Sequence, residues 1–159
     1  MTRRSAPLAL LALLLAAPTV AAQVPRASDL VSWRVRADRT APGAEARLVL
    51  DAEVAEGWKM YAIGSPVGIP LTLALDALPS GVDVGAVRQS GAKDGYDETF
   101  ASAYTYFTGA GRVVQTLRVG TATPRGTHEV TGAVRFAVCN DEICLPPVRT
   151  TFRVPLVVE

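Results

Sequence analysis

Apolar residues recur at every second position along most of this chain, which leaves few folds open to it. Near the start, Val31, Trp33 and Val35 alternate with polar residues, and residues 46–54 repeat the pattern over a longer run. This alternation places apolar side chains on one face of a β-strand, whereas a helix would require a spacing of 3.6 residues. The sequence therefore predicts strands that each have one buried face and one wet face.

Turns rich in glycine and proline divide the chain into about nine strand candidates. They cover residues 31–36, 46–54, 58–61, 71–75, 82–87, 104–107, 113–119, 130–139 and 148–158. Residues 104–107 and 113–119 resemble a hairpin joined by residues 108–111. Residues 89–103 are polar without a clear period, and we interpret them as a long functional or mobile loop. Nine strands and no amphipathic helix favour an all-β fold, an immunoglobulin-like antiparallel β-sandwich rather than a barrel.

Residues 1–22 have the three parts of a secretory signal peptide. Arg3 and Arg4 form a basic start, residues 8–17 a short apolar run, and small residues up to Ala22 a cleavage site. The run is too short to span a bilayer comfortably, although an uncleaved anchor is the alternative. We expect cleavage near Ala22, which leaves one soluble domain, residues 23–159, without membrane insertion.

Charge balance excludes one class of partner. Removing Arg3 and Arg4 from the 16 basic side chains leaves 14 basic against 15 acidic ones, without a basic run. Near-neutrality of this kind argues against nucleic acid as a partner. Export would place the two cysteines in an oxidising compartment, where a pair forms a disulfide unless something reduces it.

Both cysteines lie in one short stretch, Cys139-Asn140-Asp141-Glu142-Ile143-Cys144, followed by leucine and two prolines. Asn-Asp pairs turn readily, so a disulfide is sterically plausible. If no bulge intervenes, Cys139 points away from the core on its strand. The prolines prevent a central strand after Cys144 and predict that this sulfur begins an irregular, accessible segment.

A loop this short makes a weak structural clamp. The chain-entropy model gives it about 2 kcal/mol, against nearly 5 kcal/mol for a bridge that closes about 100 residues. A redox-active pair is one interpretation, and a purely structural disulfide is the other. The sole histidine, His128, lies near a turn, so a zinc site or a Cys-His protease is disfavoured.

The cysteine stretch resembles the N-terminal periplasmic domain of the thiol:disulfide interchange protein DsbD, a disulfide-bond corrector domain. That family has two nearby cysteines, the second followed by a bulky residue and two prolines. Two further stretches support the resemblance: Gly57-Trp58-Lys59-Met60-Tyr61, which resembles a Gly-aromatic strand ending in tyrosine, and Asp97-Glu98-Thr99-Phe100, which resembles the family's acidic-aromatic cap loop.

The resemblance implies a periplasmic domain that takes electrons from a membrane-embedded thiol reductase and passes them to exported thioredoxin-like proteins. It would act as an electron carrier or protein-disulfide reductase without a metal or cofactor. Cys144 would form the mixed disulfides and Cys139 would resolve them. Phe100 would cap the pair, with Asp97 and Glu98 beside it and Tyr61 lining the site. Because family members continue into transmembrane helices and the sequence ends at Glu159, either a separate protein would be the donor or the domain would have another use.

Nearby carboxylates would raise a cysteine pKa, because negative charge disfavours a thiolate. Asp141 and Glu142 lie in the turn itself, although they are equally explained as solvated turn residues. Two other functions stay open at this point. The chain could be an exported binding or adhesion module whose disulfide only rigidifies a loop, or a chaperone-like or metal-delivering sandwich.

Overall fold

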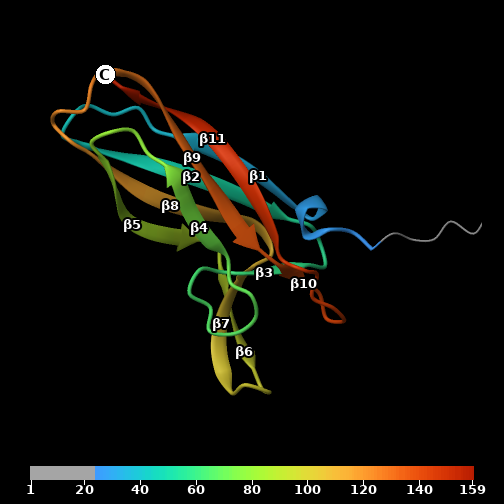
Figure 1. Ribbon diagram of the computed structural model, residues 1–159. Coiled ribbons are helices and arrows are strands. Elements are labelled where there is room, and N and C mark those ends of the chain that lie inside the picture. The colour runs from blue at the N-terminus through green and yellow to red at the C-terminus, as the bar shows by residue number, and fades with distance from the viewer. Residues whose placement is uncertain (1–23) are drawn as a thin grey trace, which may run out of the picture.

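This computed structural model describes residues 24–159, which contain eleven strands and one short 3-10 turn, Ala27–Asp29 (Figure 1). The expected signal peptide, residues 1–22, lies outside the described residues. Within residues 24–159, no helix has the length and apolar character needed to cross a membrane.

The strands form three antiparallel sheets. The first sheet has the order β1 (Val31–Ala37), β2 (Glu45–Val54), β8 (Gly109–Val119), β5 (Val82–Ser90). The second sheet has the order β11 (Val148–Val158), β9 (Gly126–Phe136), β4 (Thr72–Ala77). The end sheet has the order β10 (Val138–Cys139), β3 (Lys59–Tyr61), β7 (Ser102–Phe107), β6 (Lys93–Asp97).

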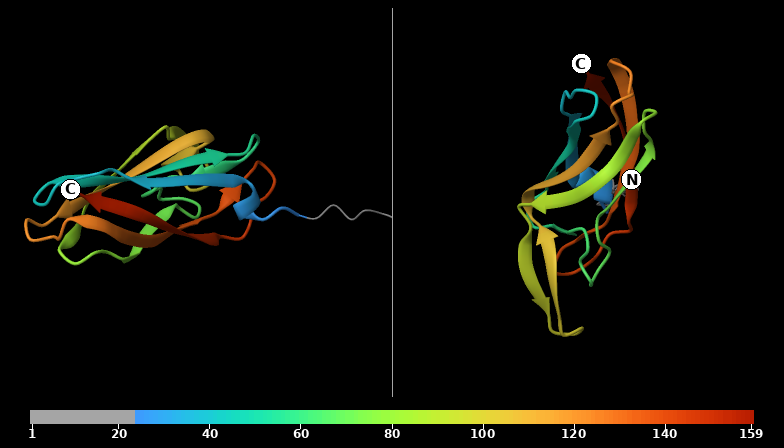
Figure 2. Two further views of the ribbon diagram at one scale, coloured as in Figure 1. Left: turned by 90° about the horizontal axis from the view of Figure 1, so that it is seen from above. Right: turned by 90° about the vertical axis from the view of Figure 1, so that its left-hand side faces the viewer.

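The first and second sheets face each other as two layers (Figure 2). Alternate residues of their strands point into one apolar core, as the spacing of two predicts. Its largest fully buried members include Leu48, Leu50, Leu117, Phe136 and Leu156. This arrangement confirms the all-β, immunoglobulin-like sandwich.

The expected hairpin between residues 104–107 and 113–119 is wrong. β7 pairs with β3 and β6 in the end sheet, whereas β8 pairs with β2 and β5 in the first sheet. The chain changes sheets at Thr108, and two glycines permit the corner. Gly109 has a φ of 64°, and a Cβ on Gly111 would lie 2.4 Å from the Phe107 ring.

The long loop expected over residues 89–103 is also wrong. β5 continues to Ser90, and β6 and β7 form a hairpin that projects from the sandwich (Figure 1). β6 is an edge strand that is largely exposed, so its sequence has no reason to alternate. The expected strand over residues 130–139 is divided at Ala137, where the chain leaves the second sheet for β10.

Candidate functional site

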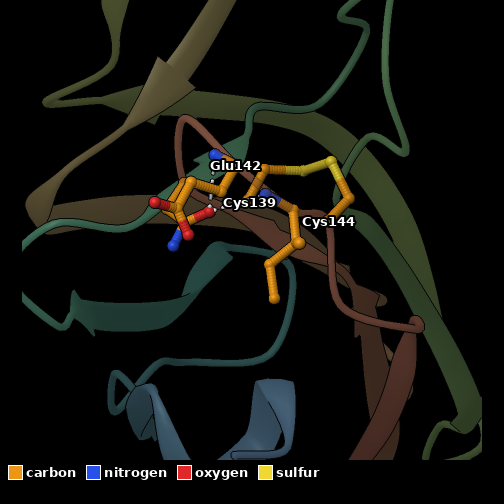
Figure 3. Close-up of a disulfide and its surroundings, with 5 residues drawn as sticks. Cys139, Glu142 and Cys144 are labelled. Atoms are coloured by element: carbon orange, nitrogen blue, oxygen red, sulfur yellow. Dashed lines mark hydrogen bonds between the residues drawn. A yellow bond between two sulfur atoms is a disulfide. The ribbon is translucent and has the colours of Figure 1, made fainter. Parts of the chain in front are cut away.

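Cys139 and Cys144 form a disulfide with a Cα–Cα distance of 4.0 Å (Figure 3). Asn140 shapes the turn between them. Its side-chain Oδ1 accepts hydrogen bonds from the backbone N–H groups of Glu142 at 2.9 Å and Ile143 at 2.8 Å. Its own N–H donates to the Ile143 carbonyl oxygen at 2.9 Å. The chain therefore reverses within the turn and brings the two cysteines opposite each other, as the Asn-Asp pair predicts.

The turn is held at one end by the end sheet and at the other by the main core. On one side, β10 pairs with β3, so that Val138 lies opposite Met60 and Cys139 opposite Lys59. On the other side, the Leu145 N–H donates to the Val138 carbonyl oxygen at 2.9 Å, and the Leu145 side chain enters the main core. The disulfide thus stands on a rigid base at one end of the molecule.

The two sulfur-bearing residues differ sharply in exposure. Cys139 is only 3% exposed and packs against Tyr61, Val67 and Tyr104 on the face of the end sheet opposite to the main core. Cys144 is exposed. Cys139 does point away from the main core, as expected, but a second small cluster covers it. The exposed side of the disulfide is therefore that of Cys144.

Three tyrosines are in contact on the face of the end sheet that carries Cys139. The ring centroids of Tyr61 and Tyr104 are 5.4 Å apart, and those of Tyr104 and Tyr106 are 5.5 Å apart. The absence of a Cβ at two glycines leaves space for these rings. A Cβ on Gly68 would lie 2.3 Å from the Tyr61 ring, and one on Gly95 would lie 2.6 Å from the Tyr104 ring. The cover over Cys139 therefore depends on close approach of backbone to ring.

A groove of about 560 Å³ opens beside the disulfide and is lined in part by Cys139. Glu53, Glu56 and Asp141 supply carboxylates to it, and Lys59 supplies an ammonium group. The Lys59 Nζ lies 5.9 Å from the centroid of the Tyr104 ring, within the range of a cation–π interaction. Residues 24–159 contain no cluster of three or more His, Cys, Asp or Glu side chains suited to a metal ion.

The structure brings only some of the predicted site residues together. Tyr61 packs with Cys139, whereas Phe100 is 71% exposed in the turn between β6 and β7 and stays outside that cluster. Asp97 Oδ1 accepts hydrogen bonds from the N–H groups of Thr99 at 2.9 Å and Phe100 at 3.0 Å, so this carboxylate shapes the hairpin turn. Glu98 lies exposed in the same turn. The role of Phe100 as a cap over the disulfide stays a prediction.

Sequence reasoning missed Tyr104, Val67 and Lys59 as neighbours of the disulfide. A period of two places Tyr104 on the same face as Tyr106, and Lys59 on the same face as Tyr61, but it does not show that these strands lie beside the cysteine turn. Val67 lies in an irregular loop, where no periodicity marks it.

Comparisons with known proteins agree with this geometry. The family model described as thiol:disulfide interchange protein DsbD, N-terminal, matches residues 27–156. No curated protein sequence matches significantly. Among solved structures, the reduced DsbD N-terminal domain of Neisseria meningitidis superposes with a TM-score of 0.55 at 18% identity, covering 84% of this chain and 90% of its own.

The N-terminal periplasmic domain of ScsB from Proteus mirabilis superposes with a TM-score of 0.54 at 14% identity, covering 86% of this chain and 49% of its own. At such low identities the two solved structures support only the shared fold, whereas the match to the family model shows that the chain belongs to the family. The family model spans most of the chain and includes both cysteines, their turn and the three tyrosines. The chain belongs to the family of the N-terminal domain of the thiol:disulfide interchange protein DsbD.

Proposed function

We propose that the Cys139–Cys144 pair carries electrons by thiol–disulfide exchange from a membrane-embedded thiol reductase to exported thioredoxin-like proteins. Family membership implies the chemistry, and one structural observation supports this use of it: an exposed Cys144 is bonded to a buried Cys139. Exchange requires one reachable sulfur and one that leaves, and this asymmetry supports Cys144 as the first and Cys139 as the second.

On the receiving side, a donor thiolate attacks Sγ of Cys144. A bond forms between the donor sulfur and Cys144, the Cys139–Cys144 bond breaks, and Cys139 leaves with the electron pair as a thiolate. The second thiolate of the donor then attacks the donor sulfur that is bonded to Cys144. This closes the donor's own disulfide and releases Cys144 as a thiolate. The donor dithiol is oxidised to a disulfide, and the pair takes up two electrons and two protons.

On the delivering side, the Cys144 thiolate attacks the disulfide of an acceptor protein and forms a mixed disulfide with it. The Cys139 thiolate then attacks Sγ of Cys144, which restores the Cys139–Cys144 bond and releases the acceptor in its reduced form. Cys144 is thus the sulfur that meets partners, and Cys139 resolves the intermediate. The rigid base of the turn supports this second step because it keeps Cys139 close to Cys144.

The setting of this exchange is the periplasm, reached by way of the signal peptide expected over residues 1–22, with residues 23–159 as the working domain. The hairpin of β6 and β7 belongs to the proposal too. It rises from the same end sheet as the disulfide, and its tip carries Asp97, Glu98 and Phe100. We assign Phe100 as a cap that moves over Cys144 between encounters. If it does, Phe100→Ala speeds reduction of the disulfide by small thiols.

Trapping partners tests the main assignment. A Cys139→Ser variant retains Cys144 but cannot resolve a mixed disulfide, so complexes with the reductase or acceptor proteins should accumulate on non-reducing gels. Cys144→Ser should accumulate none. Equal trapping by both variants would contradict the assigned roles.

The reduction potential separates this function from that of a binding module with an inert bridge. A structural disulfide in an exported protein has a potential below about −300 mV, whereas an exchanging one lies higher. Differential alkylation in cells with and without the membrane reductase would show whether the pair is cycled. A pair that is oxidised to the same extent in both would favour the binding module.

A further inference from the structure

On the receiving side and on the delivering side alike, one step requires Cys139 to carry a negative charge. This sulfur is covered by Tyr61, Val67 and Tyr104, so water solvates its thiolate poorly. Burial disfavours the charged form of a thiol, and the nearby carboxylates of Glu53, Glu56 and Asp141 act in the same direction. Fast exchange therefore requires a compensating positive charge close to Cys139.

Lys59 is positioned to supply that charge. It lies directly opposite Cys139 in the antiparallel pairing of β3 with β10, and side chains of such a pair project from the same face of a sheet. The contact of its Nζ with the Tyr104 ring confirms the direction, because Tyr104 also packs against the cluster that covers Cys139. Two independent contacts thus place the ammonium group on the side of Cys139.

The charge of Lys59 is not committed elsewhere. Its ammonium takes part in none of the ion pairs found within residues 24–159. Among the described residues that line the groove beside Cys139, it is the only cation. The side chain is half-buried, which limits screening by water and salt.

We propose that Lys59 is the electrostatic partner of the Cys139 thiolate and holds the negative charge that Cys139 acquires when the disulfide opens. This inference rests on the proposed exchange function and adds a positioning residue to it. On the receiving side, Lys59 makes Cys139 a better leaving group. On the delivering side, it raises the fraction of Cys139 present as the attacking thiolate.

The chain offers a matched control, since Lys59 and Lys93 are its two lysines. Lys93 lies on β6 of the same sheet, opposite Tyr106, and two strands further from β10 than β3 is. Lys59→Gln and Lys93→Gln remove the same charge from the same sheet at different distances from Cys139. Lys59→Arg restores the charge at the original position.

Thiolate titration gives a readout that a merely structural role would not move. In the reduced chain carrying Cys144→Ser, the ultraviolet absorbance of the remaining thiolate follows Cys139 alone. We expect Lys59→Gln to raise the midpoint by about one pH unit, Lys59→Arg to restore most of it and Lys93→Gln to leave it unchanged. An unchanged midpoint in Lys59→Gln would overturn the proposal.

Reduction of the oxidised wild-type pair by dithiothreitol provides the kinetic test. The attacking species is the thiolate of dithiothreitol, so Lys93→Gln serves as the control for the attraction that any lost lysine removes. We expect Lys59→Gln to slow reduction roughly threefold to tenfold, because a leaving thiol of higher pKa departs more slowly. Equal rates in Lys59→Gln and Lys93→Gln would contradict the role of Lys59.

These measurements need no protein partner, so their outcome is independent of the trapping experiment with Cys139→Ser. Normal trapping together with an unchanged titration would reject Lys59 and retain the exchange function. A shifted titration without any trapped partner would retain the local electrostatics and reject the exchange function.

Discussion

The sandwich and the end sheet are built on different principles. Strands β8, β9 and β11 of the sandwich each contain eleven residues, whereas β3 and β10 of the end sheet contain three and two. The sandwich is held by apolar area buried between two sheets. The outer face of the end sheet is held by a few specific contacts among tyrosine rings, glycines and Lys59.

This difference separates stability from chemistry. Changes in the sandwich should alter the free energy of unfolding and leave the disulfide's reactivity intact in molecules that remain folded. Changes on the outer face of the end sheet should alter reactivity at a smaller cost to stability. Variants that break this separation would show that the two regions are energetically coupled.

The largest effect is expected from Phe136→Ala in the sandwich. Phe136 is fully buried and lies 5.6 Å from Trp33 between ring centroids. Its truncation leaves a cavity and should cost about 3–5 kcal/mol of unfolding free energy, measured by urea denaturation. Val84→Ala is the control, because Val84 is 46% exposed on the edge strand β5 and should change stability by less than about 0.5 kcal/mol. Similar losses in both variants would refute the buried core as the source of stability.

A smaller effect is expected from Gly68→Ala, which displaces the Tyr61 ring that covers Cys139. Gly68 and Gly64 lie in the same loop with φ values of 73° and 80°, so alanine pays a similar backbone cost at either position. Only at Gly68 does the new Cβ meet a side chain, the Tyr61 ring, since nothing lies within 4 Å of it at Gly64.

The difference between Gly68→Ala and Gly64→Ala therefore isolates the contact with Tyr61. We expect Gly68→Ala to lose about 1–3 kcal/mol more in urea denaturation. We also expect dithiothreitol to reduce its disulfide faster, because the displaced ring lets water reach Cys139. If the two variants unfold and react alike, Tyr61 does not control access to the buried sulfur.

Asn140→Ala should have a third, smaller effect, confined to the disulfide. Asn140 holds the turn through its bonds from Glu142 and Ile143, and losing them lets the reduced turn spread. A loss of about 1 kcal/mol in turn stability raises the reduction potential by about 20 mV, measured against glutathione. Asn140→Asp keeps an acceptor oxygen and should stay closer to wild type. A potential that falls in Asn140→Ala would contradict this account.

The sequence predicts the sandwich better than the end sheet for the same physical reason. In the sandwich, strands such as β2 and β11 bury alternate residues against one core, so their period of two is visible in the sequence. β6 lies at an exposed edge and β10 has only two residues, so neither leaves a readable pattern. This is why the polar, aperiodic sequence of residues 89–103 predicts a loop where the chain forms strands.

The site was predictable only in part. The turn at Asn140 and the exposure of Cys144 follow from local chemistry, the Asn-Asp pair and the two prolines. The covering of Cys139 does not, because it depends on β3 and β7, which become its neighbours only through sheet pairing. Lys59 is a neighbour of Cys139 for the same reason, across 80 positions of sequence.

The smallest effect is expected in the sandwich, at Asp51. A hydrogen bond from Arg112 is the main cause that holds the pKa of Asp51 below its ordinary value, assisted by Arg36 and opposed by burial. Ionised Asp51 therefore stabilises the fold above the ordinary aspartate pKa, and this contribution disappears as pH falls through its lowered pKa.

Asp51→Asn should accordingly cost about 0.5–1 kcal/mol at pH 7, because the ion pairs are partly exposed, and less at about pH 2. Urea denaturation at both pH values measures the difference. Asp76→Asn provides the control, since Asp76 forms one exposed pair with Arg149 at 2.7 Å and should lose less. A cost for Asp51→Asn that stays constant with pH would mean that Asp51 acts through packing rather than charge. Dithiothreitol should reduce the disulfide at the same rate in the wild type, Asp51→Asn and Asp76→Asn, because Asp51 lies outside the groove beside Cys139. A changed rate in Asp51→Asn would show that the sandwich and the end sheet are energetically coupled.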